Sequence, residues 1–339
     1  MNKPKFSVPY NGDVAIVDYY IEKKKFINDV YFGLPHSILP SGRIMDYGKK
    51  PEAYNRELFL ALKKLKANNI KCSLVVNQTC EDSQTFSKEK LDHYSKIIDS
   101  FARKKMVDGI VLCNPSYVKE LKKRFPKLSF TISVNSNINT LYKARYASQM
   151  GFDIINLDRD INQDIKLIKK ISKSVPSKIK LLVNECCLNE CLFRAQHFNL
   201  LCHHEKGMEY QDRIPCVNQV SGSPWTILKS SFILPRDLSE YDNYVDTYKL
   251  AGRNMPTKLL KYLLDSYFYR REKGDLLGIL SSYGLYVWKN NFVKNNDRIP
   301  LLRMEDIPRD YRKIVNNCDF NCNSCDYCKK IWKKCLEVY

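Results

Sequence analysis

Short apolar segments alternate with amphipathic helical patterns along most of the chain, and this alternation constrains the fold more than any other feature. Strands that are separated by helices favour a parallel sheet, because each helix returns the chain to the edge where the next strand begins. Helix starts at Pro51 and Pro115 agree with this pattern, since proline fits the first helical turn. The expected strands are 29–34, 72–76, 109–113, 129–134, 153–157, 178–183, 226–234 and 245–250, and the expected helices are 51–68, 88–105, 115–124, 138–150, 163–174 and 256–271.

Eight strand units in a chain of 339 residues fit a TIM-like (β/α)8 barrel better than an open sheet. The seventh and eighth units are irregular. We therefore predict an α/β fold with a barrel at 1–271, a cluster-bearing insertion at 184–219, and a small cysteine-rich extension at 272–339.

Most of the expected strands end in polar residues. The carboxyl ends of barrel strands form the active face, so these side chains would ring one mouth of the barrel. Asparagine is also a common turn residue, which is the alternative interpretation of each one. Together they indicate a polar pocket, formed by Asn77, Asn114, Asn135, Asn156 with Asp158, and Asn184 with Glu185.

The stretch 181–219 contains five of the thirteen cysteines and three of the five histidines. Thiolates are soft ligands that suit zinc or an iron–sulfur cluster. The uneven gaps favour iron–sulfur, because zinc sites usually show two close pairs. Buried, inert thiols are the alternative. The cysteines are Cys186, Cys187, Cys191, Cys202 and Cys216, and since adjacent residues seldom bind one metal together, either Cys186 or Cys187 is expected outside the ligand set.

A second group of cysteines lies near the C-terminus. Its compact Cys-x2-Cys-x2-Cys core indicates metal binding, either a second cluster or zinc. The first three cysteines also resemble the cluster motif of radical S-adenosylmethionine enzymes, but those enzymes carry it after the first barrel strand and place an aromatic residue where this chain has Ser324. The predicted ligands in this tail are Cys318, Cys322, Cys325 and Cys328.

The chain is basic, with 56 lysines and arginines against 37 acidic residues and a formal net charge of +19. Such an excess favours phosphate-bearing partners such as RNA. The alternative is a compositional bias with solvated helix faces. The sequence lacks an apolar run of about eighteen residues and a signal-peptide core, which predicts a cytoplasmic protein without membrane insertion. Its many cysteines then suggest metal ligands or reduced thiols.

Three segments resemble the peptidase U32 family: NECCLNECLFRAQH at 184–197, LPRDL at 234–238 and YKLAGR at 248–253. The resemblance implies a TIM-like barrel that holds a [4Fe-4S] cluster. Members of this family include oxygen-independent hydroxylases of ubiquinone precursors and of RNA bases, with prephenate as the implied oxygen donor. Some act as paired subunits, so a partner subunit of the same family is expected as well.

Carried over by position, the resemblance assigns Cys187 and Cys191 as the firmest cluster ligands, completed by Cys202 and Cys216. Two departures from the better-known hydroxylases, the tighter cysteine spacing and the cysteine-rich tail, leave the substrate open.

The remaining site candidates follow from their chemistry. Lys249 and Arg253 are expected to bind an anionic substrate, or else to form an ion pair at the barrel rim. Arg43 and Arg194 are cofactor-binding candidates. His197 is expected to transfer a proton or donate to a cluster sulfur, or to be structural. Asn184 and Glu185 are expected to orient the cysteine loop or to face the substrate.

Three functions are therefore open. The leading hypothesis is an oxygen-independent hydroxylase or related redox enzyme that acts on a small molecule or an RNA base. The second is an electron-transfer subunit of a larger complex. The third is a peptidase, which the sequence favours least because the His-Glu-x-x-His motif of metalloproteases is absent.

Overall fold

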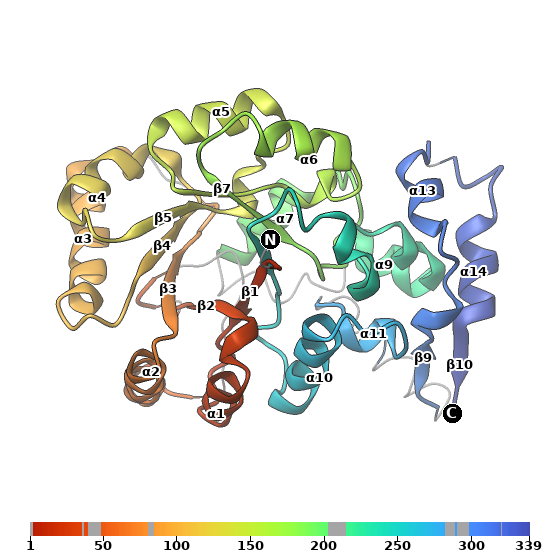
Figure 1. The fold of residues 1–339 in the computed structure, drawn as a ribbon, viewed down its shortest axis with the longest axis horizontal. Coiled ribbons are helices and arrows are strands. Elements are labelled where there is room, and N and C mark those ends of the chain that lie inside the picture. Colours follow the sequence, from red (N-terminus) through yellow and green to blue (C-terminus); the bar gives the residue numbers. More distant parts are fainter. Residues whose placement is uncertain are drawn as a thin grey trace.

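The computed structural model describes residues 3–35, 37–39, 49–80, 85–202, 215–281, 289, 298–319 and 321–339. Eight parallel strands form a closed barrel, in which the first strand pairs with both the second and the eighth (Figure 1). The predicted (β/α)8 fold is confirmed. The strands are β1 Lys5–Pro9, β2 Ile27–Phe32, β3 Lys71–Val76, β4 Gly109–Leu112, β5 Ser129–Ile132, β6 Ile154–Asn156, β7 Lys178–Leu182 and β8 Thr247–Lys249.

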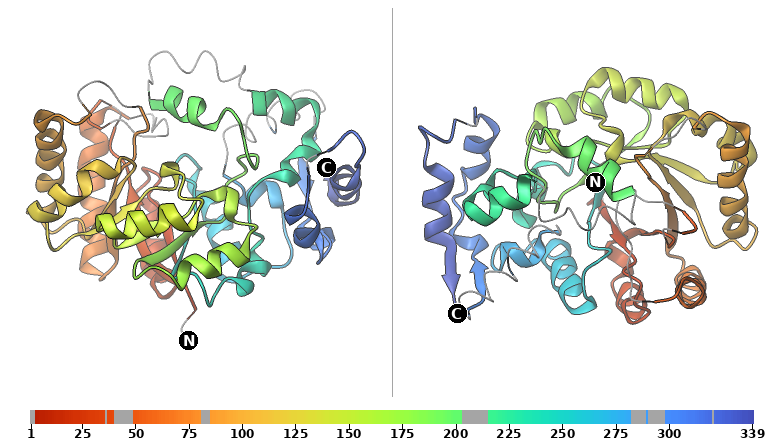
Figure 2. Two further views of the ribbon diagram at one scale, coloured as in Figure 1. Left: turned by 90° about the horizontal axis from the view of Figure 1, so that it is seen from above. Right: turned by 180° about the vertical axis from the view of Figure 1, so that it is seen from behind.

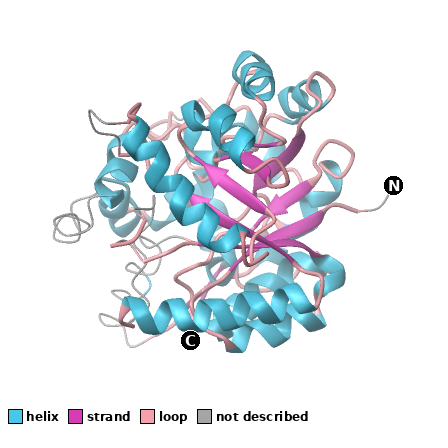
Figure 3. Cartoon of the chain, turned by 90° about the vertical axis from the view of Figure 1, so that its left-hand side faces the viewer, coloured by secondary structure: helices cyan, strands magenta, loops and turns pink. Residues whose placement is uncertain are grey.

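Helices cover the outside of the barrel (Figure 3). Each turns an apolar face inward; in α3, for example, Tyr94, Ile98 and Phe101 are buried. Ser87 caps the first turn of α3, because its side chain accepts a hydrogen bond from the Lys90 amide at 3.1 Å. These helices are α1 Ala15–Glu22, α2 Pro51–Ala67, α3 Lys88–Ala102, α4 Val118–Arg124, α5 Leu141–Met150, α6 Ile165–Ser172 and α10 Thr257–Phe268. Short 3-10 turns η1 Lys24–Phe26, η2 Pro115–Tyr117, η3 Val134–Ser136 and η4 Arg159–Ile161 connect them to the strands.

The barrel interior is polar in one layer and apolar in the next. Lys180 Nζ lies 3.4 Å from Asp29 Oδ1 and donates to Ser7 Oγ at 3.3 Å. Burial alone would raise the pKa of Asp29, but the charge of Lys180 and hydrogen bonds from neighbouring side chains hold it below its usual value. A small apolar cluster, Tyr31, Val75 and Val111, also lies among the strands.

Two expectations for the strands were wrong. The segment 226–234 is not the seventh strand: its first part belongs to the 3-10 turn η6 Pro224–Lys229, and it is buried by packing against the C-terminal part of the chain. The missing strand is β1 at the N-terminus, which was missed because it is only five residues long and its alternation of apolar and polar residues is therefore too short to stand out.

The connection from β7 to β8 is long and carries α7 Arg194–Cys202, α9 Pro215–Gly222, η6 and η7 Pro235–Glu240. Figure 2, left, shows α7 and α9 along one side of the molecule. This connection contains the predicted insertion at 184–219, so the barrel places the cysteine-rich stretch beside its own mouth.

The C-terminal extension lies beside α9 and η6 (Figure 1). It consists of α11 Leu276–Ile279, β9 Pro300–Leu302, η8 Met304–Asp306, α13 Tyr311–Asn316, α14 Tyr327–Cys335 and β10 Leu336–Val338, with β9 and β10 pairing antiparallel. The expected domain boundary at residue 271 stays a prediction. Among the helices that the structure describes, none is both long and apolar enough to cross a membrane.

Candidate functional site

The carboxyl ends of the strands surround a narrow hollow, called here the mouth hollow. Two cations lie over the face of one aromatic ring in it: Lys249 Nζ is 4.7 Å from the centre of the Tyr31 ring, and the Arg253 guanidinium carbon is 6.0 Å away. The Tyr31 hydroxyl donates to the Leu250 carbonyl at 2.8 Å, which fixes the ring. The hollow is lined by Tyr31, Val75, Asn77, Val134, Asn135, Leu182, Glu185, Phe198, Lys249, Ala251, Gly252 and Arg253.

An ion pair forms another part of this region. Glu185 Oε2 lies 3.2 Å from Arg159 Nη1, and only 1% of the Arg159 side chain is exposed. Arg159 also donates to Asn135 Oδ1 at 2.9 Å, and its guanidinium carbon lies 5.0 Å from the centre of the Phe198 ring. The mouth hollow therefore brings together a carboxylate, amides and cations.

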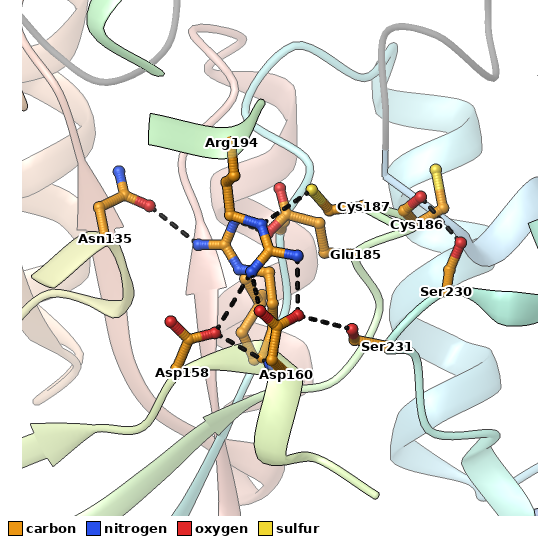
Figure 4. Close-up of polar contacts among 12 residues, drawn as sticks. Asn135, Asp158, Asp160, Glu185, Cys186, Cys187, Arg194, Ser230 and Ser231 are labelled. Carbon is orange, nitrogen blue, oxygen red and sulfur yellow. Dashed lines mark hydrogen bonds and ion pairs between the residues drawn. The ribbon is translucent and has the colours of Figure 1, made fainter. Parts of the chain in front are cut away.

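Arg194 anchors the cysteine loop to the end of β6 (Figure 4). Its guanidinium binds Asp160 through two nitrogens, donates to the Leu188 carbonyl at 2.7 Å, and donates to Cys187 Sγ at 3.4 Å. Burial lowers the pKa of Arg194, but the hydrogen bond and charge of Asp160 outweigh it and hold the pKa above its usual value. Burial raises the pKa of Asp158, whose carboxylate lies 3.6 Å from Arg194 Nη1.

The loop itself is held by the backbone that follows η6. Ser230 donates its hydroxyl to the Cys186 carbonyl at 2.9 Å, and the Ser231 amide donates to the Cys187 carbonyl at 3.4 Å. Burial raises the pKa of the Cys187 thiol, and this outweighs the lowering effect of Arg159 and Arg194. Cys187 is thus a half-buried residue whose sulfur lies beside a cation.

Cys202 has different surroundings at the other end of α7. Its sulfur accepts hydrogen bonds from the Thr79 amide at 3.1 Å and interacts with the Thr79 hydroxyl at 3.3 Å. A hydrogen bond from Cys80 is the largest cause that lowers the pKa of Cys202 to about 5. Arg194, which contacts Cys187, is the first residue of α7, and Cys202 is the last. A helix of this length spans roughly 13 Å, so Cys202 lies far from the Arg194 end of the helix.

The four predicted cluster ligands on the barrel do not meet around one point. Cys187 and Cys191 share a loop, Cys202 lies near β3, and Cys216 lies on α9 beyond the undescribed residues 203–214. Throughout the described ranges, no group of three or more His, Cys, Asp or Glu side chains is arranged to hold a metal ion. The donor chemistry, thiolates beside arginine, suits an iron–sulfur cluster in kind. The ligand set stays a prediction.

A second hollow opens next to the first and shares Asn135 and Phe198 with it. Its volume of about 480 Å³ is within the range of small-molecule sites, roughly 300–1,000 Å³. Its lining is rich in amides and hydroxyls, and it consists of Gln78, Thr79, Thr85, Phe86, Cys113, Asn114, Pro115, Asn135, Asn137, Arg194, Ala195 and Phe198.

The structure places the predicted site residues in different surroundings. Lys249, Arg253 and Glu185 line the mouth hollow. Asn184 is structural: it accepts from the Ala251 amide at 2.7 Å and donates to the carbonyls of Ala251 and Ile279. His197 lies on α7, half-buried, and lines neither hollow. Arg43 lies outside the described residues.

Sequence reasoning missed Tyr31, Arg159 and Asp160. The signal for the last two was the charged run Asp158-Arg159-Asp160, one residue after the end of β6, of which only Asp158 was recognised. Tyr31 gave no signal, because its inward position follows from the register of β2 in the barrel.

Fold and site together define a TIM-barrel protein with a charged pocket at the carboxyl ends of its strands. The model of peptidase family U32 matches residues 18–188, about half of the chain, and the chain belongs to this family.

A relative in Methanocaldococcus jannaschii, described as an uncharacterized protease, is 27% identical and aligns over 98% of this chain and 99% of its own. The solved structure of the U32 peptidase Mk0906 superposes with a TM-score of 0.55 at 16% identity, covering 74% of this chain and 94% of that one, so it shows the shared fold. Thiamine phosphate pyrophosphorylase from Pyrococcus furiosus is more distant, with a TM-score of 0.39 at 11% identity over 79% of this chain and 98% of its own.

Proposed function

We propose that this U32-family protein is an iron–sulfur redox enzyme of the oxygen-independent hydroxylase type, which binds an anionic small molecule or an RNA base at the mouth hollow. The observation that carries the proposal is the pair Lys249 and Arg253 over the Tyr31 ring. Both cations are buried, with exposed fractions of 8% and 5%, beside the loop of Cys187. Buried cations at a barrel mouth suit a ligand with carboxylate or phosphate groups.

The residues of the hollow have separate tasks in this proposal. Arg253 binds a carboxylate in a bidentate manner and Lys249 adds a point charge. The amides of Asn77 and Asn135 orient the polar part of the ligand. Prephenate, the oxygen donor implied by the family resemblance, carries two carboxylates that suit the two cations. Because the mouth hollow has a volume of only about 30 Å³, the rest of such a ligand would occupy the adjoining second hollow.

The cofactor of the proposal is a [4Fe-4S] cluster. Cys187 and Cys191, which share one loop, would supply ligands to it, and when bound it supplies one-electron transfer. Arg194 holds the loop between the first two ligands through its bonds to Asp160 and Leu188.

Two measurements test the proposal. The first is the content of iron, sulfide and zinc in anaerobically purified protein, compared between the Cys187→Ala/Cys191→Ala variant and the matched control Cys113→Ala. We expect the double variant to contain about four irons and the matching sulfide less than the control, whatever metal the cysteine-rich tail retains. Colourless wild-type protein with stoichiometric zinc would contradict the proposal.

The second measurement is prephenate binding by calorimetry. Loss of a hydrogen bond to a charged group is worth about 1.5–3 kcal/mol, so Arg253→Met should weaken binding by roughly 10- to 150-fold. The exposed Arg145 gives the control Arg145→Met, which should bind like the wild type. Equal affinities for the two variants would exclude this binding site.

One observation favours the peptidase activity that the family is named for. Hydrogen bonds from Cys80 and Thr79 lower the pKa of the Cys202 thiol, which favours its nucleophilic thiolate form, and Thr79 lines the second hollow. Hydrolysis of a fluorogenic peptide that is abolished in Cys202→Ser but kept in Ser324→Ala, at an exposed position outside both hollows, would support it. Hydrolysis that is absent from the wild type excludes it.

A further inference from the structure

The four cysteines of the tail lie within one short segment, from the end of α13 to the first turn of α14, and in this structure their side chains are not gathered around one metal position. Cys318 follows α13, Cys322 and Cys325 lie in the turn between the helices, and Cys328 lies in the first turn of α14. The turn is tight: the Asn321 amide donates to Asp319 Oδ1 at 2.9 Å, and the Ser324 amide donates to the Asn321 carbonyl at 3.3 Å. This reversal brings the start of α14 back toward the end of α13.

The four thiols are carried by one short, hydrogen-bonded turn between two helices. Cys335 does not belong to this group, because it lies two helical turns further along α14, fully buried in the core.

A cation from the barrel reaches the group. Lys229, at the end of η6, donates from Nζ to Cys322 Sγ at 3.4 Å. A set of four thiolates carries more negative charge than the metal it binds, so a neighbouring ammonium stabilises the loaded site.

We propose that Cys318, Cys322, Cys325 and Cys328 bind a thiolate-ligated metal centre with Lys229 as its counter-cation. The spacing of three, two and two residues between these cysteines, on a turn that leads into a helix, allows all of them to face one centre. Soft thiolates select zinc or an iron–sulfur cluster. The centre is separate from the barrel ligands and does not depend on the proposed function.

The same structure connects this centre to the barrel mouth through the strap Leu228–Ser231. On the tail side, the Tyr311 hydroxyl donates to the Leu228 carbonyl, and Lys229 binds Cys322. On the mouth side, the Asn189 amide donates to the Lys229 carbonyl at 3.3 Å.

On the mouth side, Ser230 and Ser231 also donate hydrogen bonds to the carbonyls of Cys186 and Cys187. Loss of the tail metal should therefore loosen the loop that carries Cys187.

The site is tested by metal analysis of the full chain on a Cys187→Ala/Cys191→Ala background, which removes the firmest barrel ligands. We expect this protein to retain either about one zinc or about four irons with sulfide. Either metal supports the site, and the analysis tells them apart. Adding Cys325→Ala should remove the metal, whereas adding the neighbouring Ser324→Ala should not. Cys325 is exposed, so its removal leaves the core intact.

Two results would overturn the site: a background protein without metal, or metal that Cys325→Ala retains. Because the barrel thiols are already absent, neither result depends on the proposed function. The role of Lys229 is tested by release of the metal to a chelator. Lys229→Met should release it several-fold faster than the exposed control Lys258→Met, and equal rates would remove Lys229 from the site.

The connection to the mouth is tested by hydrogen–deuterium exchange in the otherwise wild-type chain. Cys325→Ala should speed exchange in residues 186–194 and 225–231 relative to Ser324→Ala. Identical exchange in the two variants would show that the strap does not transmit the loss of the metal.

Discussion

Replacement of Arg194 by methionine should destabilise the protein strongly. The side chain is 9% exposed and that of its partner Asp160 is 10% exposed, so the pair is largely removed from water. Methionine keeps much of the volume and removes the charge. Asp160 is then left as a buried carboxylate without its guanidinium, and Asp158 loses a nearby positive charge.

The magnitude follows from this burial. Removal of one partner from a buried ion pair costs about 3–5 kcal/mol. With an unfolding entropy of about 2.1 cal/mol/K per residue over 339 residues, this loss lowers Tm by roughly 4–7 °C. The double variant Arg194→Met/Asp160→Asn should lose less than the sum of the two single variants, because it removes both charges.

The assay is thermal unfolding followed by circular dichroism, together with the rate at which a maleimide labels Cys187. Arg194→Met should speed labelling, because the guanidinium that binds the sulfur and the loop carbonyl is gone. Arg145→Met, at an exposed position, is the control and should stay within about 0.5 kcal/mol of the wild type. If Arg194→Met matches this control in both measurements, the assigned role of Arg194 is wrong.

Three further predictions concern the barrel and are checked by chemical or thermal unfolding. Asp29→Asn should cost about 3–5 kcal/mol at neutral pH, since it leaves Lys180 buried without its partner. The pKa of Asp29 is lower in the folded protein than in the unfolded chain, where it is about 3.9. The stabilisation by the Asp29 carboxylate is therefore complete above this unfolded value and is lost as the pH falls through the lower folded pKa. In acid, the free energies of unfolding of wild type and variant should converge. Asn184→Ala should cost at least about 3 kcal/mol, because it leaves the buried amide of Ala251 and two carbonyls without their bonds. Gly151→Ala should cost about 1–2 kcal/mol, because the glycine ends α5 at φ +106°. At each of these three positions, a loss of stability below about 0.5 kcal/mol would contradict the role assigned to the residue.

The long, regular elements were predictable from the sequence. The expected helix 51–68 matches α2, and the expected strands from 29–34 to 178–183 contain or overlap β2 to β7. These segments have a hydrophobic period that depends only on local residue order, and they are long enough for that period to be visible. The position of Lys249 and Arg253 at the mouth followed from the same reasoning, because the end of a strand fixes the end of the barrel.

Contacts between distant segments were not predictable. The segment 226–234 has the composition of a strand but is buried by the C-terminal helices, and β1 becomes a strand because β2 and β8 pair with it. Asn184 is a polar residue at a strand end, as a site residue would be. Its side-chain amide nevertheless donates a hydrogen bond to the backbone carbonyl of Ala251, 67 residues away in the sequence.

The sequence by itself determined the kind of fold and the chemistry available to this protein, because hydrophobic periods, strand ends and cysteine spacings are properties of local order. The tertiary structure decided which of those groups meet. In the folded chain Arg194 donates hydrogen bonds to Asp160, 34 residues away in the sequence, and Lys229 donates to Cys322, 93 residues away. Barrel closure and the docking of the tail bring these side chains together, and both depend on long-range packing that a single sequence does not encode locally.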